Sequence, residues 1–320
     1  MPLQKLSPLK VARQRLVNYA FWWSGALLKL RGHRLDVAAY CLVYTAFAVL
    51  NRFLPVLGLR RLNVHRFIVK QKTLWLVTKP DGLSFYLRPA QADIIYQSDY
   101  FEYNLRFFFD RIRSGTYIDV GAHIGKYAVL VGKNVGSKGR VIAIEPELEN
   151  FSLLKRNVAL NDLNNVLCLN VACFSENTQL KLYVSEESGY HSLVGHGLRT
   201  QNVSARTLDS LVQELDVDEI AAIKIDAENA EFEVLRGAQQ SLALYRPVVL
   251  FESRTPIALE KCYRLLNRCQ YEVRQLDPEN YVATPFDSTG ERIRGVGRPC
   301  RHHGSGSEPN IFDSQKGGQI

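Results

Sequence analysis

A regular alternation of strand-like and helical patterns, from about residue 115 to residue 315, constrains this fold more than any other feature of the sequence. The strand-like patterns are short apolar runs at Thr116–Val120, Val141–Glu145, Val166–Asn170, Ala221–Asp226 and Pro247–Glu252. Helical patterns lie between them at Lys126–Val135, Leu148–Leu160, Leu208–Leu215, Glu231–Ser241 and Ile257–Asn267. Such alternation is typical of βαβ units, in which helices connect parallel strands and cover the sheet. We therefore expect an α/β, Rossmann-like domain with a mostly parallel sheet and helices on both faces.

The remaining sequence is arranged around this domain. We expect an N-terminal region, a hairpin segment with an aromatic lead-in, the α/β domain and a tail, at residues 1–72, 73–114, 115–315 and 316–320. The hairpin strands are expected at 74–77 and 84–87, on either side of a Lys-Pro-Asp-Gly turn. Small polar residues and glycines at 185–204 predict a loop that interrupts the α/β domain.

Positive charge is concentrated in the N-terminal region. The whole chain carries a net charge of +8, but residues 1–70 contain twelve Lys or Arg and a single acid, Asp36. That region therefore carries +11, and residues 71–320 carry −3. A slightly acidic body does not suggest a nucleic-acid groove, and no nucleic-acid partner is expected. The basic region predicts contact with an anionic partner, such as a membrane surface.

The apolar residues of the N-terminal region have a helical period. One stripe consists of Leu16, Ala20, Trp23, Leu27 and Leu30, with basic residues on its flanks. Residues 37–50 are apolar nearly all round, but this run is shorter than the ~18 residues that a membrane-spanning helix needs. Three alternatives stay open: interfacial helices on an anionic membrane, a helical cap packed on the body, or a true membrane span.

Cysteine usage indicates the compartment. The chain has six cysteines, and none forms a C-x-x-C pair, which argues against a disulfide scaffold and a zinc ribbon. Reduced thiols are typical of the cytoplasm, and no signal-peptide pattern opens the chain. We expect a cytoplasmic protein, with peripheral membrane association through residues 1–70 as an open alternative.

The segment most specific for chemistry is the turn after the first strand of the α/β domain, Gly121-Ala-His-Ile-Gly125. In a parallel sheet this turn lies at the carboxyl edge, where ligands bind. His123 stands where the dinucleotide pattern G-x-G-x-x-G has its second glycine. Asp119, two residues before the turn, would repel a pyrophosphate but attract an ammonium or sulfonium group. The turn therefore favours a cationic small cofactor over NAD, and an NAD-dependent enzyme stays as a weaker alternative.

Acidic residues end two further strands. Glu145 ends the next strand along the chain, where it can accept hydrogen bonds from the vicinal hydroxyls of a ribose. Asp226 and Glu228 form a close pair after a later strand. One of these two carboxylates can face a positive cofactor, and the other, with a raised pKa, can act as a base. Capping of the following helix is the alternative role for the pair.

Taken in order, these segments resemble the FkbM family of S-adenosylmethionine-dependent class I methyltransferases. The matching stretches are residues 117–125, 143–146, 154–161, 223–238 and 246–252. The resemblance implies a Rossmann-like class I methyltransferase fold with S-adenosyl-L-methionine as the cofactor. It also implies methyl transfer to a hydroxyl oxygen of a sugar, glycan, lipid-linked or polyketide-like acceptor.

The resemblance further implies roles for individual residues. Asp119, Gly121 and Gly125 would hold the amino-acid end of the cofactor. Glu145 would hold its ribose, and Asp226 would lie beside its methionine portion or the acceptor. His123, in the same cofactor-binding turn, replaces the usual Asn but can still form hydrogen bonds. Asn229 replaces the usual Gly, and because Asn tolerates positive φ better than most residues, its turn can survive.

An alcohol acceptor also needs a general base. The candidates are Asp226, Glu228, Glu252 and His191, the last of which lies in the loop at 189–193. No metal site is expected, because the histidines do not have the spacing of metal ligands. A catalytically degenerate protein that binds a cofactor or a partner, anchored by its N-terminal region, is the alternative that the Asn229 departure leaves open.

Overall fold

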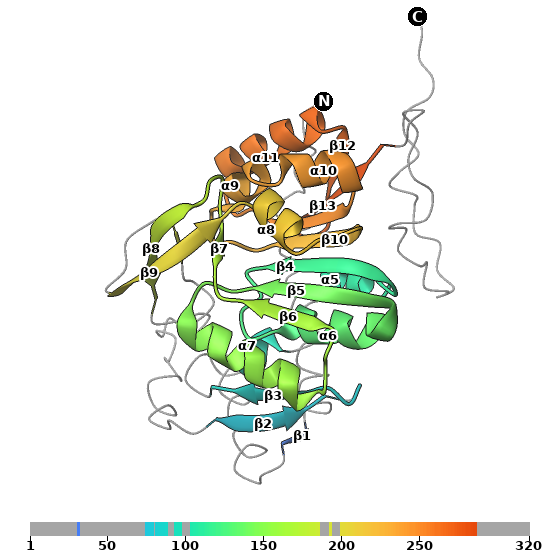
Figure 1. Ribbon diagram of the computed structural model, residues 1–320, viewed down its shortest axis with the longest axis vertical. Helices are drawn as coiled ribbons and strands as arrows, with labels where there is room; N and C mark the ends of the chain where they lie inside the picture. The colour runs from blue at the N-terminus through green and yellow to red at the C-terminus, as the bar shows by residue number, and fades with distance from the viewer. Residues whose placement is uncertain are drawn as a thin grey trace, which may run out of the picture.

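A computed structural model of the 320-residue chain describes residues 31–32, 74–79, 81–88, 93–97, 103–185, 192–193 and 199–286. In this part of the chain, seven strands form a central sheet with the spatial order β12-β13-β11-β10-β4-β5-β6 (Figure 1). The parallel strands are β4 (Gly115–Val120), β5 (Gly139–Ile144), β6 (Val166–Leu169), β10 (Ile220–Ile225) and β11 (Val248–Glu252). The hairpin of β12 (Tyr271–Gln275) and β13 (Asn280–Pro285) completes the sheet, with β13 antiparallel to both of its neighbours.

The parallel strands follow the doubly wound order, in which the chain reverses its direction of travel across the sheet between β4 and β10. This switch point brings the carboxyl ends of β4 and β10 side by side. Every residue of β4 is buried, as expected for a central parallel strand covered on both faces. The expected Rossmann-like α/β fold with a mostly parallel sheet is confirmed.

Helices cover the two faces of the sheet (Figure 1). One face carries α5 (Tyr103–Phe109), α6 (Lys126–Val135) and α7 (Leu148–Leu160), with the short turn η3 (Gly136–Lys138) after α6. The other face carries α8 (Leu208–Glu214), α9 (Glu231–Arg236), α10 (Gln239–Tyr245) and α11 (Pro256–Arg268). Successive residues of β4 serve the two cores, because Tyr117 packs into the first and Ile118 into the second.

The single helix expected over Glu231–Ser241 is two helices, so this expectation is wrong at Gly237. A Cβ atom on Gly237 would lie 2.1 Å from the carbonyl oxygen of Phe174, so the backbones can approach there only because the residue is glycine. Asp209 of α8 accepts a hydrogen bond from the N–H of Ser241 at 2.8 Å, which helps to satisfy the start of α10. The break is therefore fixed by tertiary contacts.

The loop expected at 185–204 is also partly wrong, since β9 (Arg199–Arg206) begins within it. This strand pairs antiparallel with β8 (Thr178–Val184) and parallel with β7 (Ala172–Cys173). Its Gln201 side chain donates a hydrogen bond to the carbonyl oxygen of Pro146 at 3.1 Å. The small sheet therefore contacts the carboxyl edge of the central sheet, directly after β5 (Figure 1).

The hairpin expected before the α/β domain is present. Its strands are β2 (Trp75–Thr78) and β3 (Ser84–Leu87), and β1 (Arg31–Gly32) pairs with β2. Of the N-terminal region 1–72, only β1 falls within the described residues before this hairpin; the expected helices and the tail 316–320 lie outside them. The expected domain boundaries stay predictions. In the part of the chain that is described, no helix combines the length and apolar character needed to cross a membrane.

Asn157 of α7 and Asn161, the C-cap residue of that helix, attach β3 to the domain. Asn161 accepts a hydrogen bond from the N–H of Ser84 at 2.9 Å and donates one to its carbonyl oxygen at 2.7 Å. Asn157 accepts a hydrogen bond from the N–H of Tyr86 at 2.7 Å and donates one to the carbonyl oxygen of Ile124 at 2.8 Å. The two side-chain amides satisfy β3 as a neighbouring strand would, and Asn157 also reaches the turn that starts α6.

Candidate active site

The ends of four parallel strands assemble the site. Asp119 is the penultimate residue of β4, Glu145 follows β5, Asp226 follows β10, and Glu252 ends β11. Because parallel neighbours end at the same edge of a sheet, these acids lie along one edge although they are far apart in the sequence. The switch point between β4 and β10 lies at the middle of this row.

Glycines let the backbones approach each other at the switch point. Gly121 has a φ of 77°, and a Cβ atom there would lie 1.8 Å from the carbonyl oxygen of Asp226. The N–H of Asp226 donates a hydrogen bond to the carbonyl oxygen of Val120 at 3.0 Å, which ties the two strand ends together. Gly125, with a φ of 96°, precedes α6, and a Cβ atom there would lie 2.8 Å from Cδ1 of Leu154. Gly121 is therefore required by the close approach of the two backbones, and Gly125 is favoured by its left-handed φ.

Glu145 is oriented by two main-chain donors. The N–H of His123 donates to its Oε2 at 2.9 Å, and the N–H of Glu147 donates to its Oε1 at 3.0 Å. His123 itself has a φ of 51°, in the left-handed region. Burial raises the pKa of Glu145 to about 7, although the two hydrogen bonds oppose this shift. The side chain of Asn150 forms a further hydrogen bond with this carboxylate, and the acceptor capacity that is left suits a donor such as a hydroxyl group.

The hairpin contacts the same turn through Arg88, the residue after β3. Its Nε and Nη2 donate to the two oxygens of Asp93, in the short helix α4 (Asp93–Tyr96), at 3.0 and 3.1 Å. Nη2 also donates to Oδ1 of Asn150 at 2.7 Å and lies 3.5 Å from Nε2 of His123. Arg88 therefore connects β3 with the turn after β4 and with the start of α7.

A buried lysine lies beside the acids of the switch point. Lys224 of β10 is the register partner of Asp119 on β4, so the two side chains point to the same face of the sheet. Both residues are at most 5% exposed, and Nζ of Lys224 donates to Oδ2 of Asp226 at 3.0 Å. Because a buried charge is stable only with a partner, the ammonium group and the neighbouring carboxylates stabilise one another.

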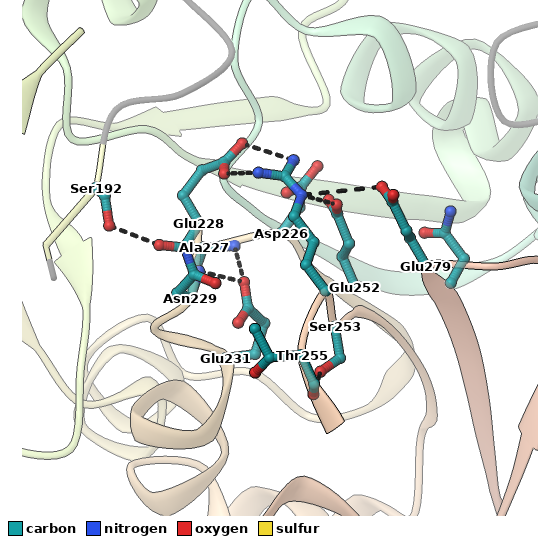
Figure 2. Close-up of polar contacts among 12 residues, drawn as sticks. Ser192, Asp226, Ala227, Glu228, Asn229, Glu231, Glu252, Ser253, Thr255 and Glu279 are labelled. Atoms are coloured by element: carbon teal, nitrogen blue, oxygen red, sulfur yellow. Dashed lines mark hydrogen bonds and ion pairs between the residues drawn. The ribbon is translucent and has the colours of Figure 1, made fainter. Parts of the chain in front are cut away.

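Further carboxylates converge beside Asp226 (Figure 2). Glu228 comes from the turn after β10, Glu252 from the end of β11, and Glu279 from the turn between β12 and β13. Arg254 joins them: its Nη1 and Nη2 donate to the two carboxylate oxygens of Glu228, and its Nε donates to Oε1 of Glu252 at 2.6 Å. Oε2 of Glu279 lies 3.9 Å from the same Nε. One guanidinium group therefore connects acids from three elements.

The acids of this cluster differ in ionisation. Burial alone would raise the pKa of Asp226, but the Lys224 ammonium, a hydrogen bond with Glu252 and the charge of Arg254 together lower it. Burial and the charge of Asp226 raise the pKa of Glu252, so the proton of that pair resides on Glu252. Burial and the same charge raise the pKa of Glu228 to about 7. Asp226 is therefore the permanent negative charge, and Glu228 can exchange a proton near neutral pH.

The turn that carries Glu228 has an unusual backbone. Glu228 and Asn229 have positive φ values of 47° and 77°. Oε1 of Glu231 accepts hydrogen bonds from the N–H groups of Ala227 and Asn229 at 3.1 and 3.0 Å, and Oγ of Ser192 donates to the carbonyl oxygen of Glu228 at 2.6 Å (Figure 2). These contacts hold two consecutive left-handed residues in place. Asn229 thus adopts the conformation for which the family pattern uses glycine.

The structure brings nearly all of the sequence-predicted residues to one edge: Asp119, Gly121, His123, Gly125, Glu145, Asp226, Glu228 and Glu252. Their assigned functions stay predictions. The alternative role in helix capping is not found, because the N-cap residue of α9 (Glu231–Arg236) is Ala230 and no side chain caps this helix. His191 lies outside the described residues. Among the described residues, no group of three or more His, Cys, Asp and Glu side chains is arranged to hold a metal ion.

Sequence reasoning missed several residues of the site. Lys224 lies within the matched stretch 223–238, and a lysine in an otherwise apolar buried strand was a signal that could have been used. Arg254 follows a strand-end acid by two residues, but nothing in the local pattern distinguishes it from a surface arginine. Arg88 and Asn157 act across elements, and their contacts have no local sequence signal.

Residues 119–273 match the family model of the methyltransferase FkbM domain. They are a methyltransferase FkbM domain. The FkbM domain extends from the end of β4 into β12, and it contains every acid of the site except Asp93 and Glu279. The expected family and the expected Rossmann-like class I methyltransferase fold are confirmed.

No curated protein matches the chain. Among solved structures, a methyltransferase FkbM from Methylobacillus flagellatus is 19% identical with a TM-score of 0.41, over 53% of this chain and 44% of that chain. A precorrin-6y C5,15-methyltransferase from Geobacter metallireducens is 14% identical with a TM-score of 0.37, over 57% and 88%. An O-methyltransferase from Bacillus cereus in complex with SAH is 16% identical with a TM-score of 0.37, over 57% and 78%. The chain thus spans less than half of the first of these relatives.

Proposed function

We propose that this protein uses its FkbM domain as an S-adenosyl-L-methionine-dependent O-methyltransferase. Its acceptor is a hydroxyl group of a sugar, glycan, lipid-linked or polyketide-like molecule. The observation that carries the proposal is the position of the buried, oriented Glu145 next to the Gly121 turn, with Asp119 and Asp226 beyond it. This order of groups matches a cofactor with a ribose diol at one end and positive charges at the other.

The chemistry of the donor set suits this cofactor. Glu145 can accept a hydrogen bond from a ribose hydroxyl, because the two main-chain donors and the Asn150 side chain leave part of its acceptor capacity unused. Asp119 and Asp226 supply negative charge for an ammonium and a sulfonium group. The left-handed backbone of His123 directs its N–H group toward the carboxylate of Glu145. These features would not favour a pyrophosphate, because like charges repel.

When bound, S-adenosylmethionine supplies an electrophilic methyl group on a positively charged sulfur. Asp226 stays ionised and offsets positive charge on the acceptor side of the site. Glu228 accepts the proton of the acceptor hydroxyl, since its pKa lies near the working pH. Alignment of the reactants and exclusion of water supply much of the remaining rate enhancement.

Calorimetric titration with S-adenosylhomocysteine and S-adenosylmethionine tests the binding part of the proposal. We expect Glu145→Gln and Asp119→Asn each to weaken binding by about tenfold or more, the usual effect of removing a charged hydrogen-bonding group. Glu260→Gln, on the exposed side of α11, is the matched control and should bind like the wild type. Equal, weak heats from all four proteins would contradict the proposal.

A labelled methyl donor tests the reaction itself. The protein, with cell extracts of glycans and lipids as acceptors, should transfer the labelled methyl group to an oxygen, and the resulting ether should survive mild alkali. Glu228→Gln should abolish transfer while binding of S-adenosylhomocysteine persists. His191→Gln tests whether His191 acts in the acceptor loop. A protein that binds the cofactor but transfers nothing to any extract would favour the degenerate alternative.

We further propose that the N-terminal region attaches this cytoplasmic enzyme to an anionic membrane surface. The support is the charge of +11 over residues 1–70, together with the stripe of Trp and Leu between basic residues. Attachment of this kind would place the site near lipid-linked acceptors.

A further inference from the structure

We propose that Arg254 is a positioning residue, whose guanidinium group holds the carboxylate of Glu228 in place to receive the acceptor proton while it holds Glu252 beside Asp226. The inference rests on the proposed function, because it concerns the base of that reaction. It adds a residue for which the sequence patterns and the family resemblance assign no role.

The geometry of the guanidinium group is the first support. Arg254 engages both oxygens of Glu228 through Nη1 and Nη2, and Glu252 through Nε, so three of its donors are committed to two acids. A planar fork with fixed donors can bind two carboxylates at a set angle, whereas an ammonium group cannot. Arg254 therefore fixes the relative position of the two acids from β11 and from the turn after β10.

Both ends of this arrangement are anchored to the fold. On the arginine side, the N–H of Ser253 donates to the carbonyl oxygen of Glu279 at 2.8 Å, and Thr255 caps α11 by accepting from the N–H of Ala258 at 3.2 Å. On the glutamate side, Ser192 holds the carbonyl oxygen of Glu228. The contact thus differs from an ordinary surface ion pair, whose long side chains lose conformational entropy when they meet.

The charge balance is the second support. The groups that face Glu228 and Glu252 are the acids Asp226, Glu231 and Glu279 and the bases Lys224 and Arg254. Lys224 is committed to Asp226, so Arg254 is the cation that offsets the other carboxylates. Burial and the charge of Asp226 raise the pKa of Glu228, and Arg254 is the largest opposing influence. Without it, Glu228 would bind its proton too tightly to act as a base at neutral pH.

Selective labelling of glutamate carboxyl carbons in the full chain, followed by an NMR pH titration, measures this effect directly. The signals are assigned from the spectra of Glu228→Gln and Glu252→Gln. We expect Arg254→Gln to move the titration midpoint of Glu228 upward by about one pH unit or more, a tenfold change in proton affinity. Arg254→Lys should move it upward by about half as much, since a lysine keeps the charge but loses the fork.

The matched control is Arg264→Gln, an exposed arginine of α11 that pairs with Glu260, and it should leave both midpoints unchanged. A purely structural role for Arg254 would lower the melting temperature without moving the midpoint of Glu228, and that result overturns the inference. If Arg254→Gln does not fold, the lysine variant decides, and an unshifted midpoint there has the same meaning. Calorimetry with S-adenosylhomocysteine on the wild type is read separately: absence of binding overturns the proposed function and, with it, this inference.

Discussion

Glu145 is a carboxylate whose use depends on pH. Burial raises the pKa of Glu145 to about 7, and only the ionised form acts purely as a hydrogen-bond acceptor for a ribose hydroxyl. The fraction of ionised Glu145 therefore rises as the pH increases through about 7. Because of the same raised pKa, the folded state binds this proton more tightly than the unfolded state does. The contribution of Glu145 therefore lowers the free energy of unfolding as the pH rises from the ordinary pKa of a glutamate, 4.5, toward about 7.

From this we expect the affinity for S-adenosylhomocysteine to increase with pH, by up to about tenfold per unit below pH 7, and to level off above pH 8. Calorimetry between pH 5.5 and 8.5 measures it. Glu145→Gln should remove most of the dependence. Glu228→Gln should retain it, although Glu228 has a similar pKa. If Glu228→Gln loses the pH dependence and Glu145→Gln keeps it, the dependence comes from Glu228 and the prediction is wrong.

Asn229 illustrates how a residue can replace glycine in a left-handed turn. Because its φ is 77°, Asn229→Gly should change the free energy of unfolding by less than about 1 kcal/mol. Asn229→Val should reduce it by about 2 kcal/mol, since β-branched residues are strained at positive φ. Urea unfolding of the two variants measures the difference. Equal stability of both would mean that the turn is not held in this conformation.

At the scale of elements, α7 joins the hairpin to the turn of residues 121–125. Asn157 and Asn161 both hold β3, but Asn157 alone of the two also holds the carbonyl oxygen of Ile124 within that turn. The stretch 154–161 matches the family, and the structure gives its two asparagines a physical role that the pattern does not reveal. The side chain of Asn157 therefore both attaches the hairpin and stabilises the turn that contains Ile124.

The two asparagines form a matched pair of variants. Asn157→Ala and Asn161→Ala should each lower the free energy of unfolding by about 1–3 kcal/mol, because each leaves main-chain groups of β3 without their partners. Asn157→Ala should also weaken binding of S-adenosylhomocysteine by about fivefold or more, whereas Asn161→Ala should leave it within about twofold. Equal affinities in the two variants would show that the contact with Ile124 does not shape the turn.

The elements that the sequence predicts best are those whose local pattern agrees with their environment. The apolar runs that form β4, β5, β10 and β11 are largely buried parallel strands, and such runs are distinctive. The run that forms β6 is apolar as well, although this strand lies at the edge of the sheet and is only partly buried. The strand β9 is rich in polar and small residues, a pattern that predicts a loop, because only Val203 and Ala205 of this strand are buried. The break at Gly237 depends on the position of Phe174, which no local pattern contains.

At the scale of the whole molecule, the site is predicted from the sequence only where its residues end strands. Asp119, Glu145 and Asp226 could be placed together because strand order fixes them at one edge. Arg254 and Arg88 could not, since their partners come from elements that are distant in sequence. The position of a strand end follows from the order of the strands, which the sequence pattern predicts. The pairing of two distant side chains depends on how the elements pack, which the local sequence does not contain.

The N-terminal region makes a prediction that concerns the entire chain. The full-length protein should sediment with vesicles that contain phosphatidylserine but not with pure phosphatidylcholine, and about 0.5 M salt should release it. Replacement of four basic residues by Gln, at Arg13, Arg15, Lys29 and Arg34, should weaken binding by about 1 kcal/mol per residue. Substitution is a cleaner test than deletion, because Arg31–Gly32 form β1 in the hairpin sheet.

The control for this experiment removes charge from the body instead. Arg236→Gln combined with Arg264→Gln leaves the N-terminal region intact and should bind vesicles like the wild type. If the N-terminal variant still binds anionic vesicles as tightly as the wild type, the surface that contacts the membrane is elsewhere.

The pairing of β1 with β2 has a thermodynamic consequence. The strand β1 belongs to the N-terminal region, β2 and β3 form a hairpin, and Asn157 of α7 connects that hairpin to the turn after β4. Linkage between two binding events is reciprocal. Under the proposed function, any factor by which binding to anionic vesicles changes the affinity for S-adenosylhomocysteine must equal the factor by which S-adenosylhomocysteine changes the affinity for the vesicles.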